Sequence, residues 1–301
     1  MFNATMKGNG WIDQFTGKIA TPIDPANIAG VKVLWELVEY GRVIKYSGSS
    51  YDIRYDRGYV YFSTPDDFKE GAAYVAVYDS SGEILWSWLI WATPAPGDTK
   101  YDDILRIMDH NLGALTSSDA TYKAGFLYQW GRKDPFPAGT SYNTTLYVYA
   151  PSISEAFKQE NNDEHFTMAY ATAHPTTHLG PAGVNWIVEN EFKTYLWLYF
   201  ENQKTIYAPC PFEWRIPYKD ELGKIFKAGL EMPGGALPGD RFFDGYHNGG
   251  SQYYWSSTAE SWTDAWSWSK GGLFTANGNS YSDWRLSSAM SIRPVRDRNP
   301  R

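Results

Sequence analysis

Carboxylate and amide side chains stand close to a tryptophan near the end of the chain, in a pattern typical of ligand-binding surfaces. The string NGNSYSDW (277–284) brings Asn277, Asn279 and Asp283 next to Trp284. Their oxygen atoms could hydrogen-bond sugar hydroxyls or ligate calcium, and the indole could stack on a sugar ring. Calcium sites usually contain several carboxylates, and this string has one, so we expect no metal here. An Asn-Gly turn without a ligand explains the same string.

Further tryptophans recur at even spacing slightly earlier in the sequence. Trp262, Trp266 and Trp268 would lie on one face of a strand, because side chains alternate between the two faces. If that face is exposed, it is a stacking platform for a ligand. If it is buried, it packs against the helix expected at 219–230. Large exposed apolar patches are uncommon on soluble proteins and usually functional.

Two aspartates in a glycine-rich loop are the remaining ligand-binding candidates. Asp240 and Asp244 lie in GDRFFDGYHNGG (239–250), where a solvated turn and a ligand contact are both consistent with the sequence. A hydrolase would need these carboxyls to share a cleft, with one pKa raised and the other lowered. His174 and His178 have a spacing compatible with zinc, but Pro175 stands between them and no third ligand is evident.

Composition and charge exclude several classes of function. The chain has 301 residues and a net charge of −7, and its Lys and Arg residues form no cluster, so nucleic acid is not an expected partner. No apolar run reaches the length of a membrane span. Cys210 is the single cysteine, so no internal disulfide can form, and we expect it to be a small buried apolar residue. Aromatic residues make up 17%, which suits either a β-rich core or sugar stacking.

The spacing of apolar runs and turns predicts two domains. Residues 31–93 are typical of short strands, expected at 31–38, 41–46, 51–64 and 72–91 with turns at 56–58 and 80–82. We therefore expect a β-sandwich domain over 1–95. The string TPAPGDTK (93–100) is the expected linker to a second domain at 100–301.

The second segment is less regular and contains one clear helical pattern. Leu222, Ile225, Phe226 and Leu230 fall on one stripe, with Pro217 and Pro233 on either side, and predict a helix at 219–230. The aromatic stretch at 185–205 is compatible with either a helix or a strand.

Five strings in the second segment resemble the domain family named for the major paralogous proteins of Fibrobacter succinogenes, in the version found on fimbrillin-like surface proteins of Bacteroidales. In order along the chain they are IMDHNLGAL (107–115), FLYQWGRKDPFPAG (126–139), YAPCPFEWRIPYKDEL (207–222), YYWSST (253–258) and SIRPVRD (291–297). Such domains are similar to the C-type-lectin-like fold, so the resemblance implies an α+β second domain with Trp255 on an inner strand. Residues 31–93 likewise resemble the β domain that precedes this module.

The resemblance also implies a location and limits the chemistry. It implies an extracellular protein attached to the cell surface or to fimbriae, whose contact with the membrane is a lipid anchor upstream of residue 1. Formylglycine-generating relatives use copper at a pair of cysteines, and this chain has Cys210 alone, so that reaction is not carried over and no cofactor is expected. The family pattern has Thr or Ser before the helix where this chain has Tyr218, and Asp220 could compensate through the helix dipole.

The sequence therefore predicts a non-catalytic adhesion protein that binds a glycan or a protein ligand of a host or bacterial surface, with other fimbrial subunits as further candidate partners. One alternative is a structural pilus or surface-layer subunit, which a long unpaired edge strand near residue 2 would favour. The second alternative is a hydrolase. The predicted ligand-binding residues are Trp262, Trp266, Trp284, Asn277, Asn279, Asp283, Asp240 and Asp244.

Overall fold

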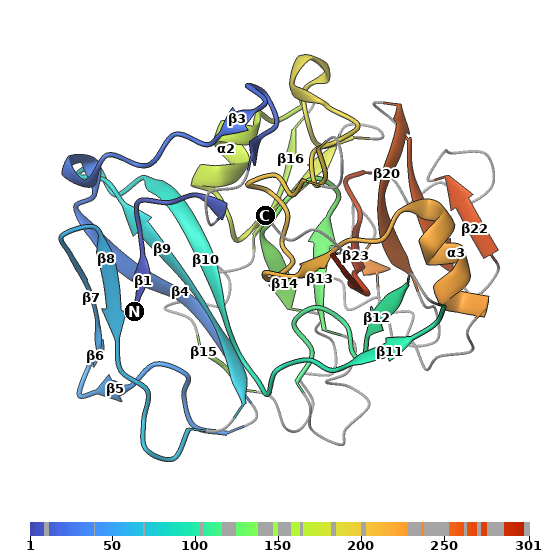
Figure 1. Cartoon of the computed structure of the whole chain (residues 1–301). Helices are drawn as coiled ribbons and strands as arrows, with labels where there is room; N and C mark the ends of the chain where they lie inside the picture. The colour runs from blue at the N-terminus through green and yellow to red at the C-terminus, as the bar shows by residue number, and fades with distance from the viewer. Residues whose placement is uncertain are drawn as a thin grey trace.

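The computed structural model describes residues 1–8, 12–38, 40–68, 70–102, 105–115, 125–137, 147–149, 158–162, 165–181, 185–199, 203–227, 236–237, 253–261, 264–269, 272–275 and 286–297. The chain is mainly β, with several small sheets and, among these residues, two short α-helices. We call residues 1–95 the first half of the chain and residues 96–301 the second half. Strands of the first half lie on the left of Figure 1 and those of the second half, apart from β15, lie at its centre and right.

A four-stranded antiparallel sheet forms the centre of the first half. Its order is β10-β9-β4-β15, with bounds β4 Gly30–Val38, β9 Gly71–Tyr78, β10 Ile84–Ala92 and β15 Tyr147–Tyr149. Strand β15 comes from the second half and pairs with the end of β4 (Figure 1). Strand β10 is therefore one edge of this sheet, and a strand contributed by the second half is the other.

A second, three-stranded sheet packs against one face of the first. It has the order β1-β8-β7, with bounds β1 Phe2–Asn3, β7 Ile53–Asp56 and β8 Tyr59–Phe62. Val33 and Val75 of the central sheet pack with Phe2, Ile53 and Phe62 of the small sheet. The turns predicted at 56–58 and 80–82 are confirmed by the hairpins that join β7 to β8 and β9 to β10.

A β-bulge in β4 distributes its side chains over both faces of the central sheet. Val33 pairs with Val75, and after a register shift Trp35 pairs with Tyr74. The inserted residue reverses the alternation, so Val33 faces the small sheet and Trp35 faces the second half, where it contacts Phe126 at 5.4 Å between ring centroids. Burial of both faces explains why the central strands are nearly continuous apolar runs.

The strand predicted at 41–46 is wrong. Residues 40–45 form no strand, and β5 covers Tyr46–Ser47 alone, paired with β6 at Ser50–Tyr51. The backbone amides of Val43 and Ile44 donate instead to Oε1 of the buried Glu36, at 2.9 and 2.7 Å. Because a side-chain carboxylate satisfies these donors, the apolar segment stays buried without a strand partner.

Two main sheets build the second half. The first has the order β11-β12-β24-β18, with β11 Asp98–Lys100, β12 Arg106–Met108, β18 Trp214–Arg215 and β24 Val295–Arg296. The second has the order β14-β13-β23-β20-β21-β22, with β19 also paired to β23. Its bounds are β13 Phe126–Gln129, β14 Pro135–Pro137, β19 Ala236–Leu237, β20 Tyr254–Ser261, β21 Asp264–Ser269, β22 Gly272–Thr275 and β23 Ala289–Ser291. Two small pairs complete the described strands, β2 Ile12–Asp13 with β3 Lys18–Ile19, and β16 Lys158–Asn162 with β17 Thr177–Pro181.

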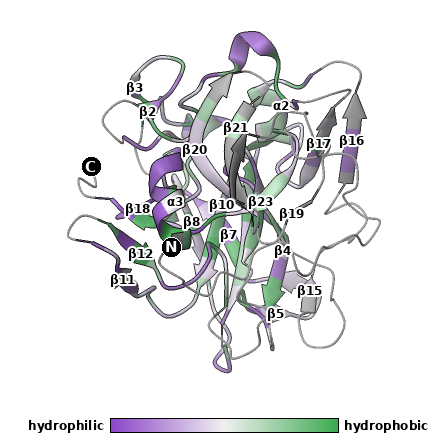
Figure 2. Cartoon of the chain, turned by 90° about the vertical axis from the view of Figure 1, so that its right-hand side faces the viewer, coloured by the Kyte–Doolittle hydropathy of each residue, from purple (hydrophilic) through white to green (hydrophobic). Residues whose placement is uncertain are grey.

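The helix predicted at 219–230 is confirmed as α3, Lys219–Lys227, whereas Leu230 lies outside the described residues. Leu222 and Ile225 pack in a cluster that includes Tyr254 of β20, and Figure 2 shows α3 lying against this sheet. Its first turn is capped by contacts that compensate for Tyr218. Thr258 Oγ1 accepts from the Lys219 amide at 3.2 Å, and the Glu221 carboxylate accepts from the Tyr218 amide at 2.9 Å.

The described part of 185–205 is neither a helix nor a paired strand, apart from short bridges and the 3-10 turn η4 at Glu189–Glu191. Side-chain hydrogen bonds, rather than the backbone hydrogen bonds of a β-sheet, hold this segment in place. The indole of Trp186 donates to Trp130 O and that of Trp197 to Arg132 O, each at 3.0 Å. The other described helix, α2, spans Met168–Ala173 and is capped by Thr167, and another 3-10 turn covers Pro25–Asn27.

Candidate functional site

Most of the predicted ligand-binding residues lie outside the part of the chain that the structure describes. This applies to Trp262, Trp284, Asn277, Asn279, Asp283, Asp240 and Asp244. The backbone of Trp266 lies in β21, but its side chain is outside the described set. Their role in binding stays a prediction. The described tryptophans of the same sequence analysis are core residues, because Trp130, Trp214 and Trp255 are 1%, 4% and 0% exposed.

The strand near residue 2 is not the long edge strand that would favour a pilus subunit. Strand β1 has two residues, and both pair with β8. The long edge strand of the described structure is β10, which has nine residues and ends the central sheet.

Three adjoining hollows follow consecutive residues of β10, and we call them together the β10 groove. The first, of about 520 Å³, is lined by residues 82–84; the second, of about 410 Å³, by 83–86; and the third, of about 260 Å³, by 86–89 and Trp91. Adjacent hollows share residues, since Glu83 and Ile84 line the first two and Trp86 lines the last two. Residues within 82–91, which belong to β10 and the turn before it, thus line all three hollows.

Helix α2 and the segment 206–212 form the opposite wall. From α2, Ala169 lines both the first and second hollows, and Thr172 lines the second. From the other segment, Pro209 and Phe212 line the third hollow. Phe212 is 56% exposed, whereas Cys210 beside it is buried, as the sequence predicts.

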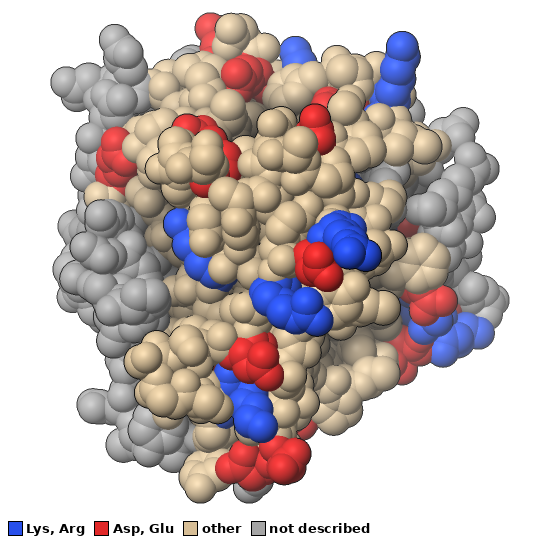
Figure 3. Space-filling model, turned by 90° about the vertical axis from the view of Figure 1, so that its left-hand side faces the viewer, with Lys and Arg blue, Asp and Glu red and all other residues tan. Residues whose placement is uncertain are grey.

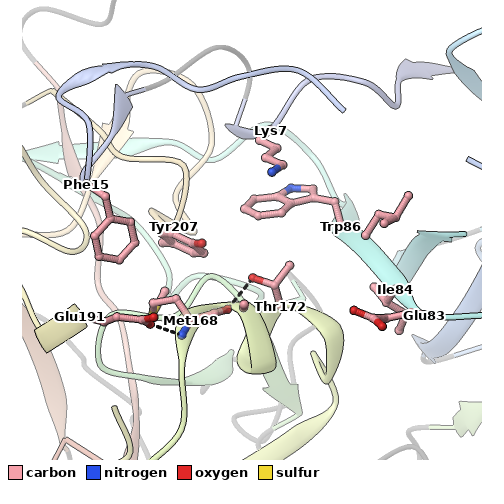
Figure 4. A pocket seen from close by; sticks show the side chains of 11 residues that line it. Lys7, Phe15, Glu83, Ile84, Trp86, Met168, Thr172, Glu191 and Tyr207 are labelled. Atoms are coloured by element: carbon pink, nitrogen blue, oxygen red, sulfur yellow. Dashed lines mark hydrogen bonds between the residues drawn. The ribbon is translucent and has the colours of Figure 1, made fainter. Parts of the chain in front are cut away.

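The middle hollow is lined by aromatic, aliphatic and charged side chains from six separate stretches of the chain. Figure 4 shows Trp86 and Tyr207 facing one another across it, with Lys7 next to the indole and Thr172 on α2 below. The two rings lie 5.6 Å apart between centroids. Glu191 reaches α2 from the side, and its carboxylate accepts from the Met168 amide at 2.6 Å.

The Trp86 ring is covered by two ammonium groups. Lys7 Nζ lies 5.5 Å and Lys133 Nζ 4.6 Å from the ring centroid. Both distances are within the range of a cation–π interaction. Because Trp86 is 2% exposed, its indole is a wall of the groove rather than an open stacking face.

A buried polar network lies behind Trp86, where the two halves meet. Lys133 Nζ donates to Ser87 Oγ at 2.5 Å and to Asp134 Oδ1 at 2.6 Å. Arg132 donates to Asp134 Oδ2 at 3.0 Å and to Gln129 Oε1 at 2.8 Å. Two cations thus share one buried carboxylate, an arrangement in which each buried charge has a partner.

The contact between Ser87 and Lys133 resembles the pairing of a nucleophile with a base, but its surroundings oppose that role. Burial lowers the pKa of Lys133, and the Asp134 charge opposes this shift. The two cations in turn hold the pKa of Asp134 below its ordinary value despite burial. Asp134 therefore stays a carboxylate that stabilises the ammonium form of Lys133. Ser87 is moreover 2% exposed, and a nucleophile needs access to its substrate.

The histidines that could act as metal ligands or bases lie against other side chains of the protein. His178 is fully buried near Arg132, and His174 is exposed on the C-terminal end of α2, stacked on Tyr170 at 3.9 Å. Among the described residues, no group of three His, Cys, Asp or Glu side chains could hold a metal. His110 Nδ1 lies 2.5 Å from Asp109 Oδ1, and its ring packs edge-on against Trp91.

Sequence reasoning missed the β10 groove, although it predicted β10 itself. The pattern of 72–91 predicts this strand, whereas Lys133 and Asp134 stand only within the string FLYQWGRKDPFPAG. The one signal in the sequence was an uncharged strand with three tryptophans beside a Lys-Asp pair elsewhere in the chain. Their proximity depends on how the two halves pack.

Neither the surface charge nor the comparisons with known proteins indicate a particular ligand. Figure 3 shows acidic and basic residues interspersed on the face of the first half, rather than a patch of one sign. Within the described chain, no helix has the length and apolar character needed to cross a membrane. No protein-family model, curated protein or solved structure matches this sequence.

Proposed function

We propose that this chain is a non-catalytic, extracellular adhesion protein of the cell surface or of fimbriae, and that it binds a glycan or protein ligand in the β10 groove. In this proposal the first half is a β-sandwich and the second a C-type-lectin-like α+β module. The extracellular location and the second fold rest on the resemblance of the five sequence strings. The location of the binding site rests on the groove.

The observation that carries the binding site is the succession of three adjoining hollows along one strand. Its first two hollows, of about 520 and 410 Å³, fall in the range of sites that bury a ligand. Lining residues come from both halves of the chain, with Trp86 from β10 and Thr172 and Tyr207 from the second half. Clefts between packed units are a common location for ligand sites.

The absence of catalysis is part of the proposal and has one structural argument in its favour. The nearest approach to a catalytic pair among the described groove residues is Ser87 with Lys133, whose Nζ donates to Ser87 Oγ and to Asp134 Oδ1. Ser87 is also 2% exposed in the middle of β10. A nucleophile needs both a base and access to its substrate.

A groove-filling variant tests the proposal. Ala169→Trp places an indole at the junction of the first two hollows, on an exposed position of α2, so the core is not altered. The matched control is Lys45→Trp, an exposed site beside β5 at the far end of the first half (Figure 1). The full chain and both variants are applied to a glycan array and to a displayed library of random octapeptides.

We expect at least one probe to bind the full chain and the control, and to bind Ala169→Trp at least tenfold more weakly. Equal binding by all three proteins would place the site elsewhere and overturn the assignment to the groove. Lack of binding to every glycan and peptide would count against adhesion through this groove as a whole.

A further inference from the structure

We infer that the third hollow of the β10 groove binds a small carboxylic acid with an apolar tail, and that Lys133 pairs with its carboxylate. Such an acid is neither a glycan nor a protein, so this site goes beyond the proposed function and does not depend on it. The hollow has a volume of about 260 Å³ and lies between β10 and the segment 206–212. None of its described lining residues comes from α2, which packs on β10 beside the first two hollows.

Lys133 is the one charged side chain among the described residues that line this hollow. The carboxylates of the groove line the other two hollows, Glu83 in both of them and Glu191 in the second. An anion that enters the third hollow therefore meets a cation, and no carboxylate of the described walls repels it. The sign of the charge in this hollow favours an anionic ligand.

Positive charges outnumber negative ones in the buried network that holds Lys133. Arg132 and Lys133 both donate to Asp134, whose side chain is 4% exposed. The other described acceptors of Arg132 are uncharged, namely Gln129 Oε1 and backbone carbonyls such as Thr177 O. These oxygens satisfy N–H donors but cancel no charge, and an uncompensated buried charge is costly. One bound carboxylate would balance the two cations.

One of the three N–H donors of Lys133 lacks a good acceptor within the network. Two of them bond Ser87 Oγ at 2.5 Å and Asp134 Oδ1 at 2.6 Å. The remaining contact, to the Tyr74 oxygen, is 3.4 Å long. The single Tyr74 proton goes to Asp134, so Ser87 is the donor in the 2.8 Å contact between the two hydroxyls, and the Tyr74 oxygen is already an acceptor. A ligand carboxylate would accept from the third N–H in a stronger, charge-assisted hydrogen bond.

The rest of the hollow fits a hydrocarbon tail. Its apolar walls include Leu89 and Trp91 of β10, Leu112, and Pro209 and Phe212 on the opposite side. A cavity of about 150 Å³ holds one benzene molecule. By the same proportion of volume to atoms, 260 Å³ accommodates an acid of about eight carbon atoms.

The polar groups of the described walls favour a free acid over a sugar or a peptide. The hydroxyls of Ser87 and Tyr74 bond one another, and the indole N–H of Trp91 donates to Ala114 O at 3.0 Å. Sugar hydroxyls and peptide amides lose hydrogen bonds to water on burial and need new partners. A hydrocarbon tail needs none, so the expected ligand is polar at its carboxylate end alone.

The first experiment compares sodium octanoate with 1-octanol, a neutral ligand of equal length, on the full chain and on Lys133→Met. Affinities are measured by calorimetry at pH 7. The substitution removes the ammonium, keeps an apolar side chain and leaves Arg132 and Asp134 as a one-to-one pair. We expect it to weaken octanoate about tenfold or more, the size of a lost charge-assisted hydrogen bond, and to change octanol less than about twofold.

A second pair of variants leaves the buried network intact. Phe212 and Phe15 are 56% and 43% exposed, at the margins of the third and second hollows. Phe212→Glu places a negative charge at the margin of the proposed site, and Phe15→Glu is the matched control. We expect Phe212→Glu to weaken octanoate about fivefold or more and Phe15→Glu to change it less than about twofold.

Methyl NMR locates the ligand on the protein. Octanoate should shift the methyl resonances of Leu89 and Leu112, which line the hollow, and not those of Leu222, which packs under α3. Shifts confined to other leucines would overturn the site.

The outcomes separate the parts of the inference. If folded Lys133→Met binds octanoate as the full chain does, or loses octanol equally, the pairing with Lys133 is wrong. If Lys133→Met does not fold, the Phe212→Glu and Phe15→Glu pair decides, and equal affinities overturn the site. Tighter binding of acetyl-leucyl-leucine than of octanoate would identify a peptide C-terminus as the ligand and overturn the free acid. Lack of octanoate binding to the full chain would overturn the site and leave the adhesion proposal, whose probes are glycans and octapeptides, standing.

Discussion

The Tyr74 hydroxyl, on strand β9 of the first half, donates to Asp134 Oδ1 of the second half at 2.5 Å. Asp134 is 3% exposed and also accepts from Lys133 and Arg132, so this carboxylate is a buried link between the two halves. Burial is the main cause that raises the pKa of Tyr74 well above its ordinary value, and the Asp134 charge adds to it, so the phenol remains a donor at neutral pH.

Asp134→Ala should destabilise the protein by about 3–5 kcal/mol, because it leaves two buried cations without their counter-charge. The control is Asp66→Ala, an exposed aspartate in the connection between β8 and β9, which should change stability by less than about 0.5 kcal/mol. Urea denaturation measures both. A cost below about 1 kcal/mol for Asp134→Ala would mean that the two cations reach water or another anion when the carboxylate is removed.

The contacts between the halves predict that they unfold together. The sequence predicts two separately folding units joined at 93–100. In the structure Gly97 N donates to Asp109, residues 98–100 form β11, and Trp35 of the first half packs on Phe126 of the second. We therefore expect one urea transition for the whole chain and no stable fold for a fragment of residues 1–95, which would lack β15 and expose the Trp35 face. Two transitions, or a folded fragment, would support the separate units.

The sequence pattern predicted helices and strands well where the alternation, turn residues or apolar stripe of a single segment determine its structure. The alternation and turn residues of 51–64 and 72–91 predicted two hairpins, and the stripe of Leu222 and Ile225 predicted α3. The prediction was wrong at 41–46, where the Glu36 carboxylate replaces a neighbouring strand, and nothing local indicates that contact.

The candidate site could not be predicted because it depends on the order of strands and on the packing of distant segments. Strand β10 is an edge strand, since β9 is its one strand partner in the described structure. An apolar run of this kind can occur at the edge or in the centre of a sheet, so the sequence does not indicate which position it takes. Lys133 lies over the Trp86 ring and donates to Ser87, the next residue of β10. Lys133 and Ser87 are 46 positions apart in the sequence. Only the tertiary arrangement brings these residues to one groove.

Two glycines with similar backbone angles should respond differently to alanine. Gly113 has φ +82° and Gly82 has φ +88°, so either Gly→Ala change costs about 1–2 kcal/mol of backbone strain. A Cβ on Gly113 would also lie 2.1 Å from Phe126 Cδ2, in the core, whereas nothing lies within 4 Å of the corresponding position on Gly82. We expect Gly113→Ala to lose at least about 1 kcal/mol more than Gly82→Ala in thermal or urea unfolding. Equal losses would show that Phe126 moves aside at little cost.

The last prediction concerns acid stability and His178. Burial, with the nearby Arg132 charge, lowers the pKa of His178 from 6.5 to about 3. The unfolded chain then binds a proton at this residue between pH 6.5 and 3, and the folded chain does not, so acidification stabilises the unfolded state. The stability that the folded chain has while His178 is neutral in both states is fully present above pH 6.5 and is lost as the pH falls toward 3.

Between pH 7 and 5 the loss should be about 2 kcal/mol, at 1.36 kcal/mol for each pH unit below 6.5. Urea denaturation at several pH values measures it. His178→Gln removes the titrating group, so its free energy of unfolding should depend on pH less steeply in this range by about that amount, whatever its stability at pH 7. The exposed His174 provides the matched variant, and His174→Gln should keep the steep dependence. The half-buried His110, whose pKa burial also lowers, gives a residual slope of the same sign in both variants. An unchanged slope in His178→Gln would show that His178 gains a proton without unfolding, and that its surroundings admit water or a counter-charge at acid pH.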